Sequence, residues 1–220
     1  MTVERRDRVP KSSALVVVSN HRSVMDAMLL MSAIDRSIRF ACHHYMGQVP
    51  VMREVVTQFG CFPLDDEKHR QNSFFHKSIG MLSTQQVVGV FPEGTLPMIH
   101  PPKPGIVGEF HRGFAHLALR APVQDLAILP IAIAPMQETV SSAIPLKMLS
   151  FFDPSEPLFD QPGWHPLLLY QKVKMLVGHP IWMSDRLRAD YSGRHAKKTV
   201  VELVDRAHGE IKTLLDQGCY

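Results

Sequence analysis

His21 and Asp26 are the side chains of this sequence best suited to acid–base chemistry, and four residues separate them. They follow an apolar run, residues 14–18, that predicts a buried strand. A neutral imidazole can take a proton from a hydroxyl group, and a nearby carboxylate can hold the ring and stabilise the charge that it gains. The pair therefore points to activation of a hydroxyl group.

The spacing decides whether the two side chains can meet. Five positions turn a regular helix by about 500°, so the two would not share a helix face. They can meet if His21 precedes the helix, with Ser23 as N-cap and Asp26 at the third helical position in a capping box. The helix N-terminus then favours ionised Asp26, which accepts a hydrogen bond from one ring nitrogen and leaves the other as a proton acceptor. This is the base-plus-orienter part of a catalytic triad.

A structural interpretation fits the same two residues, because Asp26 can be a capping carboxylate and His21 a surface residue. A second segment, Phe91-Pro92-Glu93-Gly94-Thr95, favours chemistry. Glu93 can accept hydrogen bonds from a bound hydroxyl group or hold a basic side chain, and Gly94 lets the backbone approach a ligand. The alternative is an ordinary turn at a strand end with Glu93 in solvent.

Short apolar runs alternate with amphipathic segments, which predicts an α/β fold with a mixed, largely parallel sheet flanked by helices. Pro130 is expected at a bulge or sheet edge. The predicted strands are 14–18, 39–42, 62–64, 87–91, 126–134 and 172–177. The first predicted helix begins at Ser23. The other predicted helices cover residues 51–59, 66–84, 109–120 and 194–217. Proline-rich segments 96–108 and 141–170 are expected to be irregular.

Length and composition fit a single domain over residues 1–220, with 45% apolar and 20% charged residues. The net charge of +3 suits anionic substrates or an anionic lipid surface, and without a basic tract we expect no nucleic-acid partner. The charged N-terminus lacks the core of a signal peptide, and no apolar run approaches the ~20 residues that cross a bilayer. Three cysteines without a Cys-x-x-Cys pair favour a reducing compartment. We expect a cytoplasmic protein with at most peripheral membrane contact.

No metal site is expected. Cys42, His43 and His44 are consecutive, but neighbouring strand residues point to opposite faces, and no spaced partner pair exists. The aromatic residues of 141–170 either pack within an irregular loop or dip into a membrane interface.

The two motifs together resemble those of the glycerolipid acyltransferases, the lysophosphatidate and glycerol-3-phosphate acyltransferase superfamily. Asn20-His21-Arg22-Ser23-Val24-Met25-Asp26 resembles the first motif, and Phe91-Pro92-Glu93-Gly94-Thr95 resembles the third. Weaker similarities at 110–115, 128–132 and 173–181 extend the likeness to about residues 14–182. The helix expected at 194–217 follows this motif-bearing core.

The resemblance implies acyl transfer from a thioester, acyl-CoA or acyl carrier protein, to a hydroxyl group, with no other cofactor. His21 would be the general base and Asp26 its orienting carboxylate, with no acyl-enzyme intermediate. It also implies phospholipid biosynthesis at a membrane surface, with a glycerolipid-type acceptor such as lysophosphatidate. The implied substrate-binding residues are Asn20, Ser23, Phe91, Pro92, Glu93, Gly94, Thr95 and Arg112.

Two departures leave the acceptor open. Asp66 stands where the family's second motif usually has a phosphate-binding arginine, although Lys68, His69 and Arg70 follow shortly after. Leu96 stands where a basic residue usually follows the third motif, so Lys103 or Arg112 would have to reach the site instead. Three alternatives therefore remain: an acyltransferase for an acceptor without phosphate, a non-catalytic lipid- or acyl-carrier-binding protein on the same scaffold, and a hydrolase in which His21 activates water.

Overall fold

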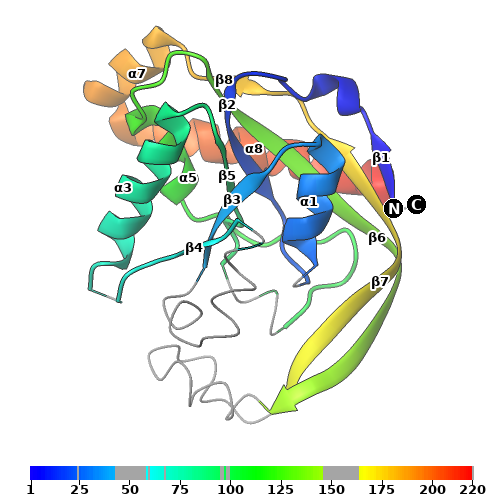
Figure 1. Cartoon of the computed structure of the whole chain (residues 1–220). Coiled ribbons are helices and arrows are strands. Elements are labelled where there is room, and N and C mark those ends of the chain that lie inside the picture. Colours follow the sequence, from blue (N-terminus) through cyan, green and yellow to red (C-terminus); the bar gives the residue numbers. More distant parts are fainter. Residues whose placement is uncertain are drawn as a thin grey trace.

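The computed structural model describes residues 1–23, 25–42, 58, 60–66, 68–94, 97, 100–145 and 164–219, without the side chains of 142–145 and 164–167. Within these residues one sheet of eight strands forms the centre of the molecule (Figure 1). The strand order is β1-β7-β6-β2-β5-β3-β4, and β8 pairs with β6. The strands are β1 (Thr2–Glu4), β2 (Ala14–Ser19), β3 (Ile38–Cys42), β4 (Phe62–Pro63), β5 (Val87–Val90), β6 (Leu126–Pro145), β7 (Trp164–Val177) and β8 (Ile181–Trp182).

The strand directions confirm the predicted mixed, largely parallel sheet. Strand β2 is parallel to both β5 and β6, and β3 is parallel to both β4 and β5. Strands β7 and β8 run antiparallel to β6, and β1 is parallel to β7. The strand β1 is not among those expected from the sequence.

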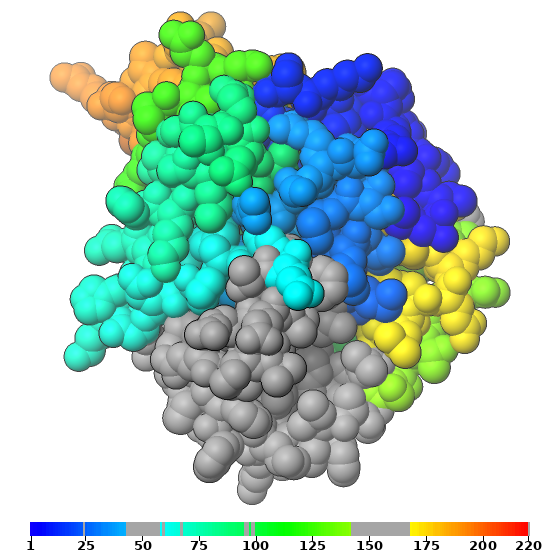
Figure 2. All heavy atoms as spheres, in the orientation of Figure 1, coloured from blue at the N-terminus to red at the C-terminus, as the bar shows by residue number. Residues whose placement is uncertain are grey.

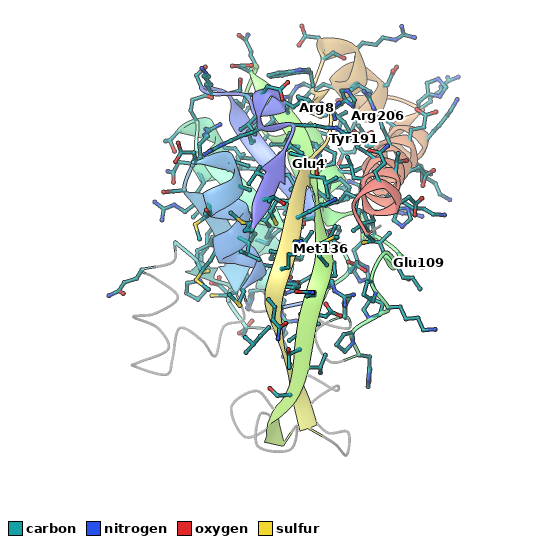
Figure 3. The ribbon with its side chains drawn as sticks, turned by 90° about the vertical axis from the view of Figure 1, so that its right-hand side faces the viewer. Glu4, Arg8, Glu109, Met136, Tyr191 and Arg206 are labelled. Carbon is teal, nitrogen blue, oxygen red and sulfur yellow. The ribbon has the colours of Figure 1, made fainter. Side chains whose placement is uncertain are left out.

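Helices cover both faces of the sheet because alternate strand residues point to opposite sides. Val16 and Val18 of β2 belong to the core under α3, α5 and α8, whereas Leu15 and Val17 face α1. Figure 3 shows this layering edge-on, with α1 on one side and α7 and α8 on the other. The helices are α1 (Asp26–Ile34), α3 (Arg70–Ser83), α5 (Gly113–Arg120), α7 (Asp185–Ser192) and α8 (Ala196–Gly218), with a 3-10 turn η1 (Arg6–Arg8) near the N-terminus.

The helices expected at 66–84 and 109–120 begin four residues later than predicted, at Arg70 and Gly113. The helix expected at 51–59 lies outside the described residues, apart from Gln58. Helix α8 buries the expected apolar stripe, including Val200, Ala207 and Ile211. Helix α7 projects from one corner of the molecule (Figure 2).

The largest difference from the sequence prediction lies in 141–170. This segment is not irregular where it is described, because β6 extends to Pro145 and β7 begins at Trp164. The two strands continue beyond the rest of the sheet as a two-stranded ribbon (Figure 1). Register shifts interrupt their pairing between Pro135 and Glu138.

Pro130 lies inside the sheet rather than at its edge. Strand β6 pairs with β2 on one side, and on the other with β8 at Ala127–Ile128 and with β7 from Ile131 onward. The Pro130 carbonyl accepts from the Gly178 amide in the connection between β7 and β8. In a strand, the nitrogen and the carbonyl of one residue point to the same side. The nitrogen of Pro130, which carries no hydrogen, therefore faces the connection between β7 and β8, and no hydrogen bond to β2 is lost.

Candidate active site

The two motifs meet because β2 and β5 are parallel neighbours whose ends coincide. Val18 of β2 pairs with Val90 of β5, so the segments 20–22 and 91–93 leave the sheet side by side. In open α/β sheets the carboxyl ends of the strands are the usual location of ligand sites. The fold therefore brings His21 and Glu93 together from distant parts of the sequence.

His21 and Asp26 form the predicted pair. The Nδ1 atom of His21 lies 2.9 Å from Oδ2 of Asp26, and the Asp26 side chain is fully buried. An ionised carboxylate can only accept a hydrogen bond, so the contact places the ring proton on Nδ1 and leaves Nε2 as an acceptor. No hydrogen bond to Nε2 is seen within the described part of the chain. The contact between the two side chains is confirmed.

Ser23 and Asp26 make the hydrogen bonds typical of the predicted capping box, but the helix start differs from the expected one. Helix α1 begins at Asp26 itself, after Met25, instead of placing Asp26 at the third helical position. The same Oδ2 atom accepts from the backbone amides of Arg22, at 2.7 Å, and Ser23, at 2.8 Å. The Ser23 hydroxyl accepts from the Met25 amide at 3.2 Å. The peptide segment before α1 thus wraps around the carboxylate and holds it next to the imidazole.

Tyr170 binds the second oxygen of this carboxylate. Its hydroxyl donates to Oδ1 of Asp26 at 2.8 Å from strand β7. Burial, followed by the charge of Asp26, raises the pKa of Tyr170, so the phenol stays protonated and remains a donor. Sequence reasoning missed this residue, because the register shifts between β6 and β7 break the alternation that would have placed it on the buried face.

The imidazole lies on a stack of aromatic rings. The rings of His21 and Phe91 are stacked with centroids 3.9 Å apart, and Phe91 stacks on Phe40 at 5.1 Å. Phe40 in turn lies against Gly89, where a Cβ atom would come within 2.2 Å of the Phe40 ring. The bare backbone of Gly89 therefore leaves the space that this stack occupies.

Glu93 joins the two motif segments through backbone amides. Its Oε1 accepts from the His21 amide at 3.1 Å, and its Oε2 accepts from the Gly108 amide at 2.6 Å. The side chain is buried, so the alternative of a solvated turn residue is wrong. Gly94 has a φ of +73°, in the left-handed region that favours glycine, and its amide closes a turn onto the Phe91 carbonyl.

Asn20 and Ser23, which are predicted to bind substrate, make hydrogen bonds within the fold. The Asn20 side chain exchanges two hydrogen bonds with the backbone of Ile133, at 3.0 and 2.8 Å. The Ser23 hydroxyl donates to the Leu168 carbonyl at 2.6 Å. Both residues fasten the His21 loop to the β6–β7 pair.

Arg22 was not expected at the site, yet it is almost fully buried beside the pair. Its guanidinium donates to the Pro102 carbonyl at 2.6 Å and to Oε1 of Glu138 at 2.7 Å. The Nε atom of Arg22 and the Oε2 atom of Glu138 are buried and have no hydrogen-bond partner among the residues that the structure describes. Sequence reasoning had no signal for this ion pair, since 116 positions separate its members.

Arg112 makes no hydrogen bond or ion pair with the described residues around His21. It stands at the N-cap of α5 and lines a separate cavity with residues of α5, α7 and α8. Phe91 and Pro92 lie in the third-motif segment beside His21. Thr95 and Leu96 lie outside the described residues. The structure therefore assembles six of the predicted residues around the His21–Asp26 pair, namely Asn20, Ser23, Phe91, Pro92, Glu93 and Gly94.

The acidic residues of the second motif have their own basic partners. Lys77 Nζ lies 2.9 Å from Asp65, and His69 Nδ1 lies 2.7 Å from Asp66. The hydrogen bond from Lys77 lowers the pKa of Asp65, and that from His69 lowers the pKa of Asp66. His69 is thus engaged with Asp66, the residue that replaces the expected arginine.

No group of three or more His, Cys, Asp or Glu side chains that could hold a metal ion occurs among the described residues. His43 and His44 lie outside them, and burial raises the pKa of the Cys42 thiol to about 12. None of the helices in the described ranges is long and apolar enough to span a membrane.

The comparisons with known proteins agree with this fold. The family model described as Acyltransferase matches residues 1–134. The chain therefore belongs to the acyltransferase family, and the resemblance inferred from the two motifs is confirmed.

The structure is similar to the crystal structure of the 1-acyl-sn-glycerophosphate (LPA) acyltransferase, PlsC, from Thermotoga maritima. The TM-score is 0.57 at 20% sequence identity, and the match covers 96% of this chain and 71% of that chain. At this identity the similarity establishes the fold. A search of curated protein sequences finds no match.

Proposed function

We propose that this acyltransferase moves a fatty acyl group from a thioester to a hydroxyl group of a glycerolipid-type acceptor such as lysophosphatidate. The observation that carries the proposal is the His21–Asp26 contact, which leaves Nε2 of a half-buried imidazole as the proton acceptor. Membership of the acyltransferase family supplies the type of reaction.

In the proposed reaction, Nε2 of His21 takes the proton of the acceptor hydroxyl as its oxygen attacks the thioester carbonyl. A carbon–oxygen bond forms and the carbon–sulfur bond breaks. The imidazolium then gives its proton to the departing thiolate, which leaves as a thiol. Buried Asp26 stabilises the imidazolium, and general-base help of this kind is typically worth ~10²–10⁴ in rate. No residue of the protein carries the acyl group.

The surrounding residues support this role by position. Tyr170 and two backbone amides hold the Asp26 carboxylate, while Glu93 holds the His21 backbone. The stack on Phe91 fixes the plane of the imidazole. Together these contacts restrict the base to one orientation before substrate arrives, which lowers the entropic cost of the reaction.

We further propose acyl-CoA or acyl carrier protein as donor and a site of action at the cytoplasmic surface of a membrane. The mildly basic net charge supports contact with anionic lipid. The pairing of Asp66 with His69 favours an acceptor whose phosphate, if present, is bound elsewhere.

The test is a thiol-release assay with acyl-CoA and acyl carrier protein, with and without a panel of hydroxyl acceptors. We expect release that depends on the acceptor, and near-complete loss in His21→Ala with folding retained. His76→Ala, on the exposed side of α3, is the matched control. Release without acceptor would indicate the hydrolase, no release would indicate the binding protein, and wild-type turnover in His21→Ala would refute the base.

A further inference from the structure

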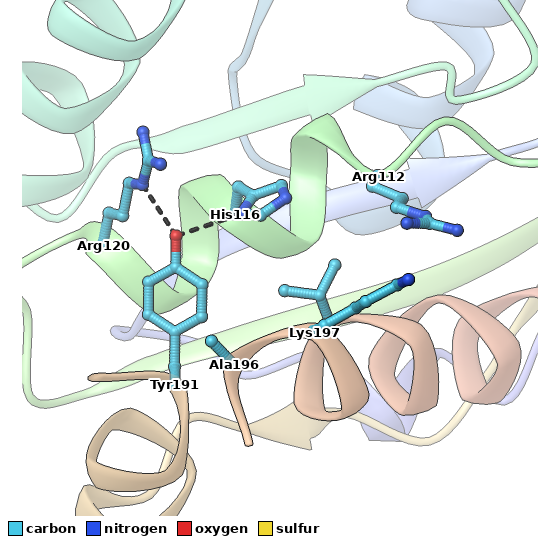
Figure 4. Close-up of a pocket in the computed structure, with 7 residues that line it drawn as sticks. Arg112, His116, Arg120, Tyr191, Ala196 and Lys197 are labelled. Carbon is cyan, nitrogen blue, oxygen red and sulfur yellow. Dashed lines mark hydrogen bonds between the residues drawn. The ribbon is translucent and has the colours of Figure 1, made fainter. Parts of the chain in front are cut away.

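A cavity of about 560 Å³ lies between α5, α7 and α8, and none of the residues that line it belongs to the His21 site. Figure 4 shows Arg112, His116 and Arg120 from α5 arranged around it, with Tyr191 from α7 and Lys197 from α8. This volume lies in the range of pockets that bind small organic ligands.

The lining carries positive charge without a compensating carboxylate. Arg112, Arg120 and Lys197 line the cavity, and none of the described Asp or Glu side chains does. None of the three forms an ion pair with another described residue. Uncompensated cations that share a concave site favour an anionic ligand.

One of these cations is held in place before any ligand binds. The Nε atom of Arg120 donates to the Tyr191 hydroxyl at 2.8 Å, and its guanidinium carbon lies 5.1 Å from the centre of the Phe75 ring. These contacts occupy one edge and one face of the guanidinium. Its two terminal nitrogens make no hydrogen bond within the described part of the chain, so they remain a fork suited to phosphate oxygens.

The ends of two helices add to the positive potential. Helices α5 and α8 both begin at this cavity, which is lined by Arg112, the N-cap of α5, and by Ala196, the first residue of α8. Both helices lack a side-chain cap and an acidic residue in the first turn. Helix α7 differs, because Ser184 caps it and Asp185 lies in its first turn. The partial positive charge of two helix N-termini thus reinforces the three side chains.

We propose that this cavity binds the phosphate monoester group of a larger ligand. Arg112 and Lys197, which lie on the same side of the cavity in Figure 4, bind its oxygens, and the rest of the cavity, with Arg120 at the other end of α5, holds the attached body. Two ligands relevant to an acyltransferase carry such a group. Coenzyme A has a 3′-phosphate, and a phosphatidate-type lipid has a phosphate monoester headgroup. The proposal does not depend on the role of His21.

His116 gives a local readout of binding. Burial, with Arg120 and Arg112, lowers the pKa of His116. The charged and titratable groups around it are Arg112 and Arg120 on its own helix, Lys197 on α8 and Tyr191 on α7. A bound phosphate dianion opposes these cations, so it moves the His116 titration to higher pH.

The experiment follows the His116 ring signals by NMR during titration with inorganic phosphate, with His116→Asn identifying the signals. We expect a saturable upward shift of the His116 titration, and an affinity at least about tenfold weaker in Arg112→Gln/Lys197→Gln, as for loss of a charge-assisted hydrogen bond. Lys198→Gln, one residue along α8 and outside the cavity lining, controls for the loss of charge. A shift equal to that caused by chloride at the same ionic strength, or unchanged in the double variant, overturns the proposal.

The source of the phosphate is then tested in the same assay by competition. Coenzyme A competing better than 3′-dephospho-coenzyme A assigns the donor, and vesicles of phosphatidate competing better than vesicles of phosphatidylcholine assign the lipid. Failure of both to displace inorganic phosphate contradicts a larger ligand. Because the readout is His116, these outcomes stay separate from any failure of acyl transfer.

Discussion

The hydroxyl of Tyr170 donates to Oδ1 of Asp26 at 2.8 Å, across 144 positions of sequence. The carboxylate is therefore held at one oxygen by the phenol and at the other by His21 and two peptide amides. This contact connects the long strand β7 to the proposed base. It defines Tyr170 as a positioning residue, because its hydroxyl acts on the imidazole through Asp26.

The variant Tyr170→Phe is expected to lower kcat about tenfold, the effect of losing one hydrogen bond to a charged group. We expect the KM for the acceptor to stay nearly unchanged, because the lost hydrogen bond acts on the base through Asp26. Gln171, next to Tyr170 on β7, makes an exposed hydrogen bond to Thr139 of β6. The variant Gln171→Met removes this bond and controls for damage to the two-stranded ribbon. A wild-type kcat in Tyr170→Phe would contradict this positioning role.

Glu93→Gln tests whether this residue positions the base or binds the acceptor. Glutamine keeps one acceptor oxygen and turns an amide group toward a backbone N–H, so one of the bonds to His21 or Gly108 is lost. We expect kcat to fall by about 10- to 100-fold, with the KM for the acceptor nearly unchanged. Glu109→Gln, exposed in the same loop, is the control. A rise in KM with kcat retained would return Glu93 to acceptor binding.

Two glycine variants test the support beneath the aromatic stack. In Gly89→Ala the new methyl group meets the Phe40 ring, and overpacking of this kind costs about 1–3 kcal/mol. We expect a lower Tm and lower kcat at temperatures where the protein stays folded, because Phe91 and His21 move with Phe40. Gly80→Ala, in α3 with no atom within 4 Å of the new Cβ, should raise stability by about 0.5–1 kcal/mol. Equal melting curves for the two variants would contradict this packing.

His116 makes stability depend on pH. Its pKa is lowered in the folded protein, so the unfolded chain binds more protons between that pKa and the ordinary value of about 6.5. Stability therefore falls as pH falls through this window. In phosphate-free buffer, His116→Gln should lose less stability than the wild type between about pH 7 and pH 5.5, measured by urea unfolding. A wild-type pH slope in His116→Gln would contradict the prediction.

The parts of the fold that depend on local pattern were predictable. The run 14–18 forms β2, and the helical stripe of residues 194–217 forms most of α8, because apolar spacing alone defines such elements. The pairing of His21 with Asp26 was predictable for the same reason, since a few residues decide it.

The support of the site was not predictable, because it depends on contacts between distant strands. The bonds of Tyr170 to Asp26 and Arg22 to Glu138 form only through the register of β6 and β7, which a bulge shifts. The contact of Glu93 with the His21 backbone was not predictable either, because it depends on the sheet order that places β5 next to β2. The motif predicted which residues gather, and the topology decided what several of them contact.

The peptide groups that hold the Asp26 carboxylate have a consequence for how this site tolerates change. Two of its four hydrogen bonds come from main-chain N–H groups, which every residue except proline possesses. Exchange of the side chains at 22 and 23 leaves these two donors in place, at a separate cost for the lost side-chain bonds. An insertion or deletion between 21 and 26 displaces the anion from its donors. The site therefore constrains the number of residues between His21 and Asp26 more strongly than it constrains their types.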